Sequence, residues 1–253
     1  MPHQLQTDDL AAKHPPVEVA SSGTEAADSL GFDPERCGRE YGVREGTGTG
    51  GEDSRDTRPD RATRFIETAR GFLSYAELAP YLSDRVTAVE AALLKGAFVD
   101  SPLNESLLLD LHHRIAGDLV PDWAGRWRDV EVVVGRLLPP PPYQIALLMR
   151  DYVRDLNARW NALSEREELL LELLAFAEGR FLSIHPFRDF NGRTIRVFLI
   201  ELLRRLDLPR VELAPQTESG RVEYFAALEA ADRRDWYPLT DIWKVRLTNA
   251  QSH

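Results

Sequence analysis

The sequence contains a single cysteine in 253 residues and has no long apolar run. One cysteine, Cys37, cannot form an internal disulfide, and no cysteine and histidine spacing is typical of a zinc site. The apolar stretches are far shorter than the roughly 20 residues that cross a bilayer, so we expect no membrane segment. A basic region followed by an apolar run is missing at the N-terminus, so we also expect no signal peptide.

Positive charge is scarce as well. The chain has 31 Lys and Arg against 41 Asp and Glu, a formal net charge of −10. Nucleic-acid binding depends largely on the neutralisation of phosphates by basic residues, so we expect no nucleic-acid partner. Lysine is rarer than arginine, a composition that suggests a GC-rich bacterial source. We therefore expect a bacterial cytoplasmic protein, with secretion as an effector left open.

The first 62 residues differ from the rest of the chain. They hold 13 Asp and Glu, 7 Lys and Arg, and 8 of the 16 glycines. They show no apolar periodicity, so they cannot bury enough surface to offset the entropy cost of ordering. We expect residues 1–62 to form a disordered or loosely attached acidic tail, and residues 63–248 to form one domain.

Helical periodicity dominates from Thr63 onward. Asn104 is a candidate N-cap for a helix that carries Leu107, Leu111 and Ile115. Expected helices also include segments that start at Thr63, contain Val86–Leu93, and cover 143–163, 165–183, 191–206, 222–232 and 238–247. The strongest strand signal is Arg126–Gly135, where four valines lie between two glycines and precede four prolines. We predict an all-α fold with one short β-hairpin.

The segment His185–Arg196 concentrates chemically useful residues. It links an apolar helix to the N-terminus of the next, where free N–H groups and the helix dipole favour phosphate. Gly192 lets a phosphate approach the backbone, and Arg193 and Arg196 can donate charge-assisted hydrogen bonds to it. Asp189 is a suitable Mg²⁺ ligand and His185 a suitable general base. Each feature alone has an ordinary structural explanation, but their joint occurrence in 12 residues indicates a functional site.

His185–Arg196 resembles the signature of the Fic family, His-x-Phe-x-Asp/Glu-Gly-Asn-Gly-Arg-x-x-Arg. Each defining position matches except Phe190, where the family usually has glycine. Leu111 and His112 resemble the family's upstream helix, and the region around Arg221 and Tyr224 resembles a downstream helix. The resemblance implies a Fic/Fido helical domain. In this domain Gly125–Arg128 would lead into a β-hairpin, called the flap, at Val130–Gly135.

The resemblance also implies a function, the transfer of AMP from ATP to a Ser, Thr or Tyr hydroxyl of a protein target, with Mg²⁺ as cofactor. The target would dock as an added strand on the flap, Val130–Gly135. Implied site residues are the base His185; the metal ligand Asp189; the nucleotide-binding residues Asp189, Phe190, Asn191, Gly192, Arg193 and Arg196; and Tyr224 as a possible nucleoside contact.

Phe190 leaves the donor open. Phenylalanine is strained at positive φ, so either the loop avoids that conformation or the ring packs on something, which could be the nucleotide. Transfer of another nucleotide or of a phosphate group, and a catalytically weak Fic-like interaction module, are the alternatives. Gly192 and Arg193 favour AMP transfer over the phosphate-transferring branch of the family.

Many members of the family carry an inhibitory helix, Ser/Thr-x-x-x-Glu-Gly/Asn, whose glutamate pairs with the second arginine of the motif. The segment Thr63–Glu67 matches this spacing, although Thr68 follows where the family has Gly or Asn. We therefore consider Glu67 as an inhibitory residue against Arg196, with a surface glutamate at a helix start as the alternative. An antitoxin chain or self-association is a further possible means of control.

Overall fold

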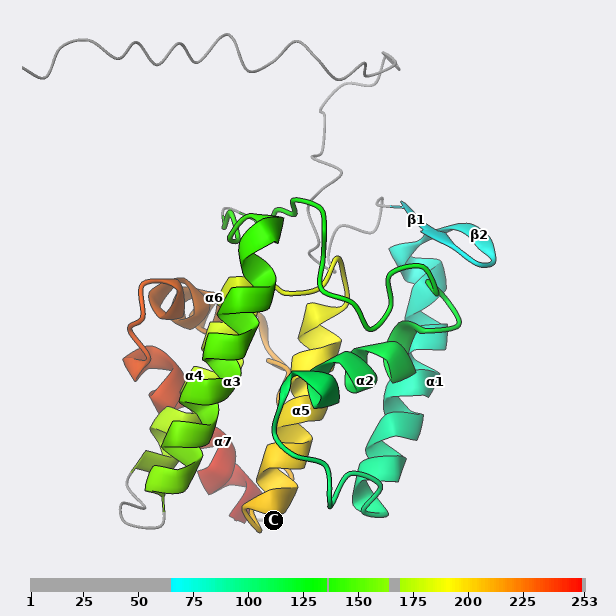
Figure 1. Cartoon of the computed structure of the whole chain (residues 1–253). Helices are drawn as coiled ribbons and strands as arrows, with labels where there is room; N and C mark the ends of the chain where they lie inside the picture. Colours follow the sequence, from blue (N-terminus) through cyan, green and yellow to red (C-terminus); the bar gives the residue numbers. More distant parts are fainter. Residues whose placement is uncertain (1–64, 136, 164–168, 252–253) are drawn as a thin grey trace, which may run out of the picture. The chain divides into compact units, whose positions relative to one another are not determined.

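The computed structural model describes residues 65–135, 137–163 and 169–251. The predicted tail, residues 1–62, lies outside these ranges, as does the start of the predicted domain at Thr63. The described residues form seven α-helices, one short 3₁₀ helix and one two-stranded antiparallel hairpin (Figure 1). The predicted helical class with a small hairpin is confirmed, and no described helix is long and apolar enough to cross a membrane.

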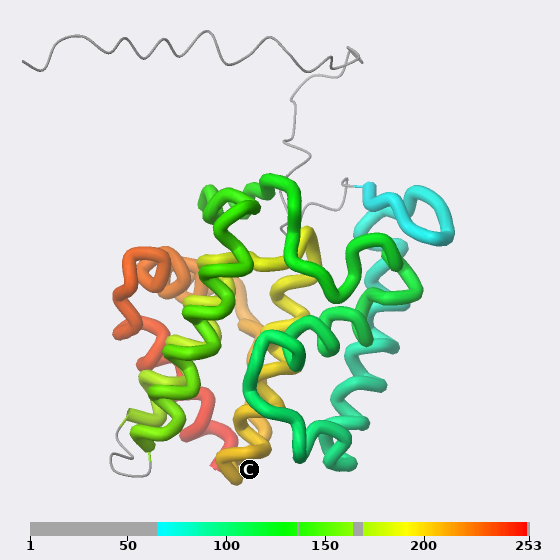
Figure 2. Tube along the Cα trace, in the orientation of Figure 1, coloured from blue at the N-terminus to red at the C-terminus, as the bar shows by residue number. Residues whose placement is uncertain are grey.

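Helix α4 lies at the centre of the fold. Its neighbours are α3, α5, α6 and α7, and most of its residues from Leu173 to Phe181 are buried. The helices are α1 (Tyr75–Leu94), α2 (Glu105–Ala116), α3 (Ile145–Ala162), α4 (Leu170–Ile184), α5 (Asn191–Arg205), α6 (Glu218–Asp232) and α7 (Tyr237–Gln251), with the 3₁₀ helix η1 at Pro142–Gln144. Figure 2 follows the same path as a tube, with α4 and α5 joined by one short loop. The helices packed against α4 and α5 therefore fix the positions of both ends of that loop.

Gly179 explains how closely the last two helices approach α4. A Cβ atom at this position would lie 2.8 Å from atoms of both Ala231 and Leu239. Glycine is therefore the residue that allows α4 to contact the α6–α7 corner at this point.

Asn104 caps α2 as the sequence predicts, because its side-chain oxygen accepts a hydrogen bond from the N–H of Leu107 at 3.1 Å. The predicted helices after residue 143 are also present, with ends shifted by a few residues.

The helix predicted to start at Thr63 is wrong. Residues Phe65–Thr68 and Gly71–Ser74 form the antiparallel strands β1 and β2. Gly71 has a φ of 96°, which closes the two-residue turn between the strands, and the Thr68 hydroxyl donates to the Gly71 carbonyl. The apolar spacing at 65, 66, 69 and 72 fits a helix, but the turn chemistry decides the local structure. Helix α1 begins only after Ser74, which forms a capping box with Glu77.

The strand predicted at Arg126–Gly135 is also largely absent. Val134 and Leu137 form a single antiparallel bridge around Gly135, whose φ is 62°. Val133 is also a bridge residue, whereas Val130 lies in a bend and Glu131 and Val132 belong to no strand. We call Val130–Gly135 the flap, because it occupies the place in the chain where the sequence predicts the hairpin. Four valines supply strand propensity, but propensity without a neighbouring strand does not make a sheet.

A buried ion pair joins α4 to α7 and stabilises this half of the fold. Arg246 donates to Glu178 at 2.7 Å, and the two residues are 9% and 1% exposed. Replacement of Arg246 by alanine would leave the Glu178 carboxylate buried without its charge partner. We expect the free energy of unfolding to fall by about 3–5 kcal/mol in Arg246→Ala, measured by urea denaturation.

Arg154→Ala is the matched control for this prediction. Arg154 pairs with Asp151 on the surface of α3, and its side chain is 68% exposed. We expect this change to cost less than about 1 kcal/mol. Equal losses in the two variants would show that the Glu178–Arg246 pair does not have the predicted importance.

Candidate functional site

The loop between α4 and α5 begins and ends with residues in the left-handed region. His185 has a φ of 49° and ends α4, where its N–H donates to the Phe181 carbonyl at 2.9 Å. Phe190 has a φ of 60° and immediately precedes α5. Non-glycine residues rarely adopt this conformation, at a cost of about 1–2 kcal/mol each, so packing around the loop must offset the strain.

Aromatic packing holds Phe190 in place. Its side chain is 3% exposed and stacks on Trp123 with ring centroids 5.6 Å apart and an interplanar angle of 20°. The Tyr75 and His112 rings also lie within 6.4 Å of it. Of the two outcomes considered from the sequence, the loop does adopt positive φ, and the ring packs on the protein core. The buried side chain of Phe190 therefore cannot cover a nucleotide at the helix N-terminus.

Side chains of the loop itself fix its curvature. The Asn191 side chain accepts from the N–H of Phe187 and donates to the carbonyl of the same residue, both at 2.9 Å. One oxygen of Asp189 accepts from the N–H of Phe190 at 2.7 Å. Asn191 is thus a clamp across the loop, and its contribution to an anion site would come from its backbone N–H.

His112 holds the loop from α2. Its Nδ1 accepts from the N–H of Gly125 at 2.9 Å, so its Nε2 carries the hydrogen and donates to the Asp189 carbonyl at 3.1 Å. The ring stacks on Phe187 with centroids 3.8 Å apart. Burial, with a smaller effect of His113, lowers the pKa of His112 from 6.5 to about 3. The neutral imidazole is therefore the form that this hydrogen-bond pattern requires.

Arg128 holds the loop from the other side. Its guanidinium donates to carbonyl oxygens of His185 at 2.8 Å, Val130 at 3.0 Å and Pro140. Its own N–H donates to the Pro186 carbonyl at 2.9 Å. Burial lowers the pKa of Arg128 to about 10, which still leaves it charged at neutral pH. A single buried side chain thus connects the end of α4, the start of the loop and the flap.

The N-terminus of α5 is built to receive an anion. The first helical residues, Asn191 and Gly192, have N–H groups that donate no backbone hydrogen bond to another described residue. A Cβ atom at Gly192 would meet only Arg196 among the protein groups nearby, at 3.7 Å. Space therefore remains for a ligand to approach this backbone closely.

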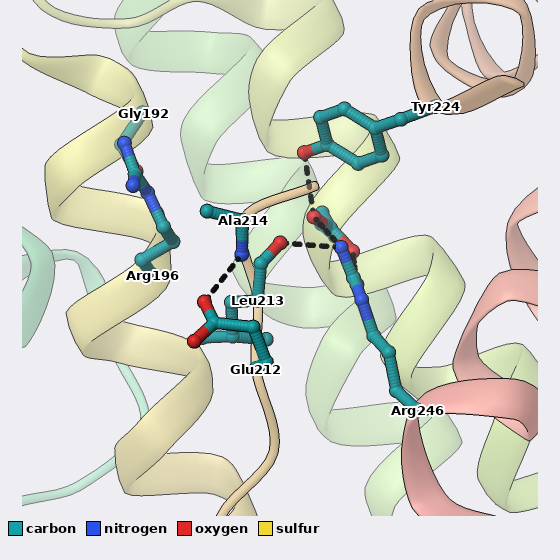
Figure 3. Close-up of polar contacts among 8 residues, drawn as sticks. Gly192, Arg196, Glu212, Leu213, Ala214, Tyr224 and Arg246 are labelled. Atoms are coloured by element: carbon teal, nitrogen blue, oxygen red, sulfur yellow. Dashed lines mark hydrogen bonds and ion pairs between the residues drawn. The ribbon is translucent and has the colours of Figure 1, made fainter. Parts of the chain in front are cut away.

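Arg193 and Arg196 are positioned beside that N-terminus. Arg193 donates to the Tyr75 hydroxyl and lies over the Tyr75 ring, 5.3 Å from its centroid. Arg196 donates through Nε to the Gly192 carbonyl at 2.8 Å, and Figure 3 shows the two residues on the same helix. These contacts use part of each guanidinium, and both side chains line a cavity of about 340 Å³ between α1, α5 and residues 210–214.

A second cavity, of about 640 Å³, lies on the Asp189 side of the loop. Its lining comes from β1, from Val120–Trp123, from the flap and from Arg188 and Asp189. The arginines of α5 thus line one cavity, and the loop residues Arg188 and Asp189 line another together with the flap and β1.

Tyr224 is engaged in a structural contact. Its hydroxyl donates to Glu178 at 2.6 Å, and Arg246 lies 5.5 Å from its ring centroid (Figure 3). Burial and the neighbouring Glu178 carboxylate raise the pKa of Tyr224 well above 10. The Tyr224 hydroxyl is therefore committed to a contact within the protein, and its partly buried ring packs against the core.

Glu67 does not lie on an inhibitory helix, because its segment is strand β1. Its side chain lines the cavity that contains Asp189, whereas Arg196 lines the other cavity. Among the described residues, no ion pair joins Glu67 to Arg196. The helical premise of the inhibitory assignment is therefore wrong.

The structure brings together six of the residues predicted from the sequence: His185, Asp189, Asn191, Gly192, Arg193 and Arg196. It adds three positioning residues that sequence reasoning missed, His112, Arg128 and Tyr75. His112 and Arg128 both lie in segments that resemble the family, but no spacing rule marks a single buried arginine or histidine as a clamp for a loop.

Comparison with known proteins supports this assignment of the loop. Residues 102–203 match the model of the Fic/DOC family. The chain is 34% identical over 131 residues to protein adenylyltransferase fic-1 of Caenorhabditis elegans, and 36% identical over 133 residues to protein adenylyltransferase Fic of Drosophila melanogaster. Each alignment covers 52% of this chain, and the chain spans only about a quarter of those relatives, 24% and 25%.

Solved structures show the same fold. The N-terminal Fic domain of Bep8 from Bartonella sp. 1-1C matches with a TM-score of 0.59 at 19% identity, over 73% of this chain and 91% of that domain. BepC of Bartonella tribocorum, solved with bound AMPPNP, matches with a TM-score of 0.55 at 18% identity, over 72% and 91%.

The buried neutral His112 generates a prediction about pH. Its folded pKa lies below its ordinary value, so the unfolded chain takes up the proton first as the pH falls. The stability that the neutral ring contributes is complete above pH 6.5 and is lost between that pH and about 3. We expect the free energy of unfolding of the wild type to fall faster in this window than that of His112→Gln, by up to about 1.4 kcal/mol per pH unit.

Urea denaturation at a series of pH values measures this difference. His113→Gln is the matched control, because the neighbouring side chain is exposed. The control should follow the wild type, and a His112→Gln curve parallel to both would contradict the prediction.

Proposed function

Because residues 102–203 of this chain match the model of the Fic/DOC family, we propose that the chain is a protein adenylyltransferase that moves AMP from ATP to a Ser, Thr or Tyr hydroxyl of a protein. The adenylyltransferase names of the relatives support the reaction, although the chain spans only a quarter of their length. The observation that carries the proposal is the loop that holds the buried residues His185 and Asp189 and leads directly into the N-terminus of α5, whose first turns carry Arg193 and Arg196.

The phosphate end of the nucleotide would bind at the start of α5. The N–H groups of Asn191 and Gly192 and the positive end of the helix dipole favour an anion at that position. Arg193 and Arg196 would donate charge-assisted hydrogen bonds to the outer phosphates. Tyr75 keeps Arg193 in position, so less side-chain entropy is lost when the nucleotide binds.

The residues present suit Mg²⁺ held jointly with the nucleotide. The described residues contain no group of three or more acidic or histidine side chains that could hold a metal alone. Mg²⁺ is commonly bound by one or two carboxylates together with substrate phosphates and water, and Asp189 supplies one such carboxylate beside the anion site. Bound there, the ion would neutralise phosphate charge; Asp189 is 4% exposed and is oriented by the Phe190 N–H.

His185 would act as the general base. The acceptor hydroxyl oxygen attacks the α phosphorus, its proton passes to an imidazole nitrogen of His185, and the bond to the bridging oxygen of the β phosphate breaks to release pyrophosphate. Since His185 is 7% exposed and is held by Arg128 through its carbonyl, its ring has a restricted position from which to accept this proton.

The flap offers the acceptor a place to bind. Val130–Val132 line the cavity next to Asp189, so an extended segment of the target that enters this cavity could lie along the flap. The buried Phe190 ring leaves the anion site open, and this argues for an active enzyme over an interaction module in which that ring blocks the nucleotide.

Labelled nucleotides test the proposal directly. We expect a radiolabel on the α phosphate of ATP to become attached to protein in a lysate or to the chain itself, and a label on the γ phosphate to remain unattached. Transfer of the γ label would identify a phosphotransferase, and preference for labelled GTP, CTP or UTP would identify another nucleotide donor.

The variant His185→Ala ties the activity to the loop. Loss of a general base typically slows a reaction by about 10²–10⁴, so α-label incorporation should fall by that factor while the protein stays folded. His113→Ala, a change at an exposed histidine, should retain the wild-type rate. Wild-type incorporation by His185→Ala would refute the proposed role of the loop.

A further inference from the structure

Arg193 and Arg196 share their cavity with a third arginine, Arg210, to which the proposed function gives no role. Arg210 lies in the connection between α5 and α6 and lines the same cavity of about 340 Å³. The other charged lining residues are two glutamates, Glu90 and Glu212. Three guanidinium groups against two carboxylates leave the lining with an excess of positive charge, which favours an anionic occupant.

The three guanidinium groups have hydrogen-bond donors left for such an occupant. Arg193 uses Nη1 for the Tyr75 hydroxyl, and Arg196 uses Nε for a carbonyl of its own helix. Arg210 uses Nη2 for the Glu90 carboxylate. In the part of the chain that the structure describes, these guanidinium groups form no further hydrogen bond. Two nitrogens of each group can therefore donate to oxygen atoms of a ligand in the cavity.

The backbone that carries Arg210 is held against the core. Leu213, three residues further on, is 6% exposed, and its carbonyl accepts a hydrogen bond from Arg246 at 2.6 Å. Arg246 is itself fixed by its buried ion pair with Glu178. Figure 3 shows Leu213 between Arg246 on one side and Arg196 of α5 on the other. This connection is therefore a fixed wall of the cavity, although its residues form no helix or strand.

The side chain of Arg210, by contrast, is held by a weak contact. It is 58% exposed, and its ion-pair partner on α1, Glu90, is 21% exposed. Ion pairs that are open to water contribute little to stability, and a phosphate offers the same guanidinium group charge-assisted hydrogen bonds. Arg210 can therefore exchange the carboxylate for a phosphate while its backbone stays in place.

We propose that Arg210 is a third phosphate-binding residue and binds the outermost phosphate of a nucleoside triphosphate. The proposal rests on the proposed function, in which the phosphates of the donor lie at the N-terminus of α5 beside Arg193 and Arg196. Ile200, one helical turn beyond Arg196, also lines the cavity, so the space continues past these two arginines. A triphosphate extends one phosphate further than a diphosphate and is the donor that reaches Arg210. The site therefore selects triphosphates over diphosphates.

Equilibrium binding of two nucleotide analogues tests the proposal without catalysis. The probes are α,β-methylene-ATP and α,β-methylene-ADP, in which carbon replaces the oxygen of the bond that transfer would break. Calorimetry gives the dissociation constant of each probe for the full-length wild type and for full-length Arg210→Gln. We expect the variant to bind the triphosphate about five- to tenfold more weakly, because charge-assisted bonds to phosphate are lost. Its affinity for the diphosphate should equal that of the wild type.

Two further variants assign the effect to the position and the charge of Arg210. Arg154 is also an exposed arginine in an ion pair, with Asp151, but it does not line the cavity. Arg154→Gln should therefore leave both affinities unchanged. Arg210→Lys keeps the charge without the planar guanidinium group, so it should lose less of the triphosphate affinity than Arg210→Gln does.

An unchanged ratio of triphosphate to diphosphate affinity in Arg210→Gln would overturn the proposal and leave Arg210 as a surface partner of Glu90. Equal weakening of both probes would overturn it as well, because the effect would then not concern the outermost phosphate. Neither probe can donate AMP, so these results do not depend on the transfer reaction. A changed ratio in a chain that transfers no α label would support the phosphate site and refute the proposed function.

Discussion

The buried guanidinium of Arg128 is the contact on which the site depends. Taking a charged group out of water is costly unless its hydrogen-bonding capacity is used, and Arg128 donates to carbonyl oxygens of His185, Val130 and Pro140. Carbonyls at the end of α4 carry the negative end of the helix dipole, which favours a cation at this point. One side chain therefore fixes where α4 ends, where the loop begins and where the flap lies against both.

Strain in the loop is offset by what surrounds it. His185 and Phe190 both lie at positive φ, and Phe190 is the position at which the segment His185–Arg196 departs from the signature that it resembles. The phenylalanine ring compensates by stacking in a cluster with Trp123, His112 and Tyr75. The neutral His112 then connects this cluster to the Asp189 carbonyl. Burial of the phenylalanine ring thus offsets the strain of the backbone, and space remains beside Gly192 at the start of α5.

Much of the reactive loop could be predicted from the sequence because its residues are adjacent in the chain. The motif from His185 to Arg196 places the base, the acidic ligand, the glycine and the arginines within one loop and one helix turn. Helix α2 was predictable for a similar reason, since Asn104 and the apolar spacing after it are local signals. Signals of this kind predict structure well because they act between residues that are close in the chain and agree with the fold around them.

Features that depend on contacts between distant residues were not predictable. The spacing of Phe65, Ile66 and Phe72 fits a helix, but the turn at Gly71 folds these residues into a hairpin. Four valines in the flap favour a strand, yet Val130 and Val132 belong to no strand and Val134 forms an isolated bridge with Leu137. Arg128 lies 57 residues from His185, the residue whose carbonyl it binds, and no periodicity connects them. These errors reflect the dependence of strands and buried polar contacts on partners that sequence patterns do not reveal.

The most direct test of the central claim, that a prearranged loop makes the chain an adenylyltransferase, is the rate of α-label transfer by Arg128→Lys. Lysine keeps the positive charge but lacks the planar guanidinium that reaches several carbonyls at once. The account predicts transfer at least about tenfold slower than in the wild type, since small displacements of catalytic groups are costly, in a protein that still unfolds cooperatively. A folded Arg128→Lys variant that transfers AMP at the wild-type rate would contradict it.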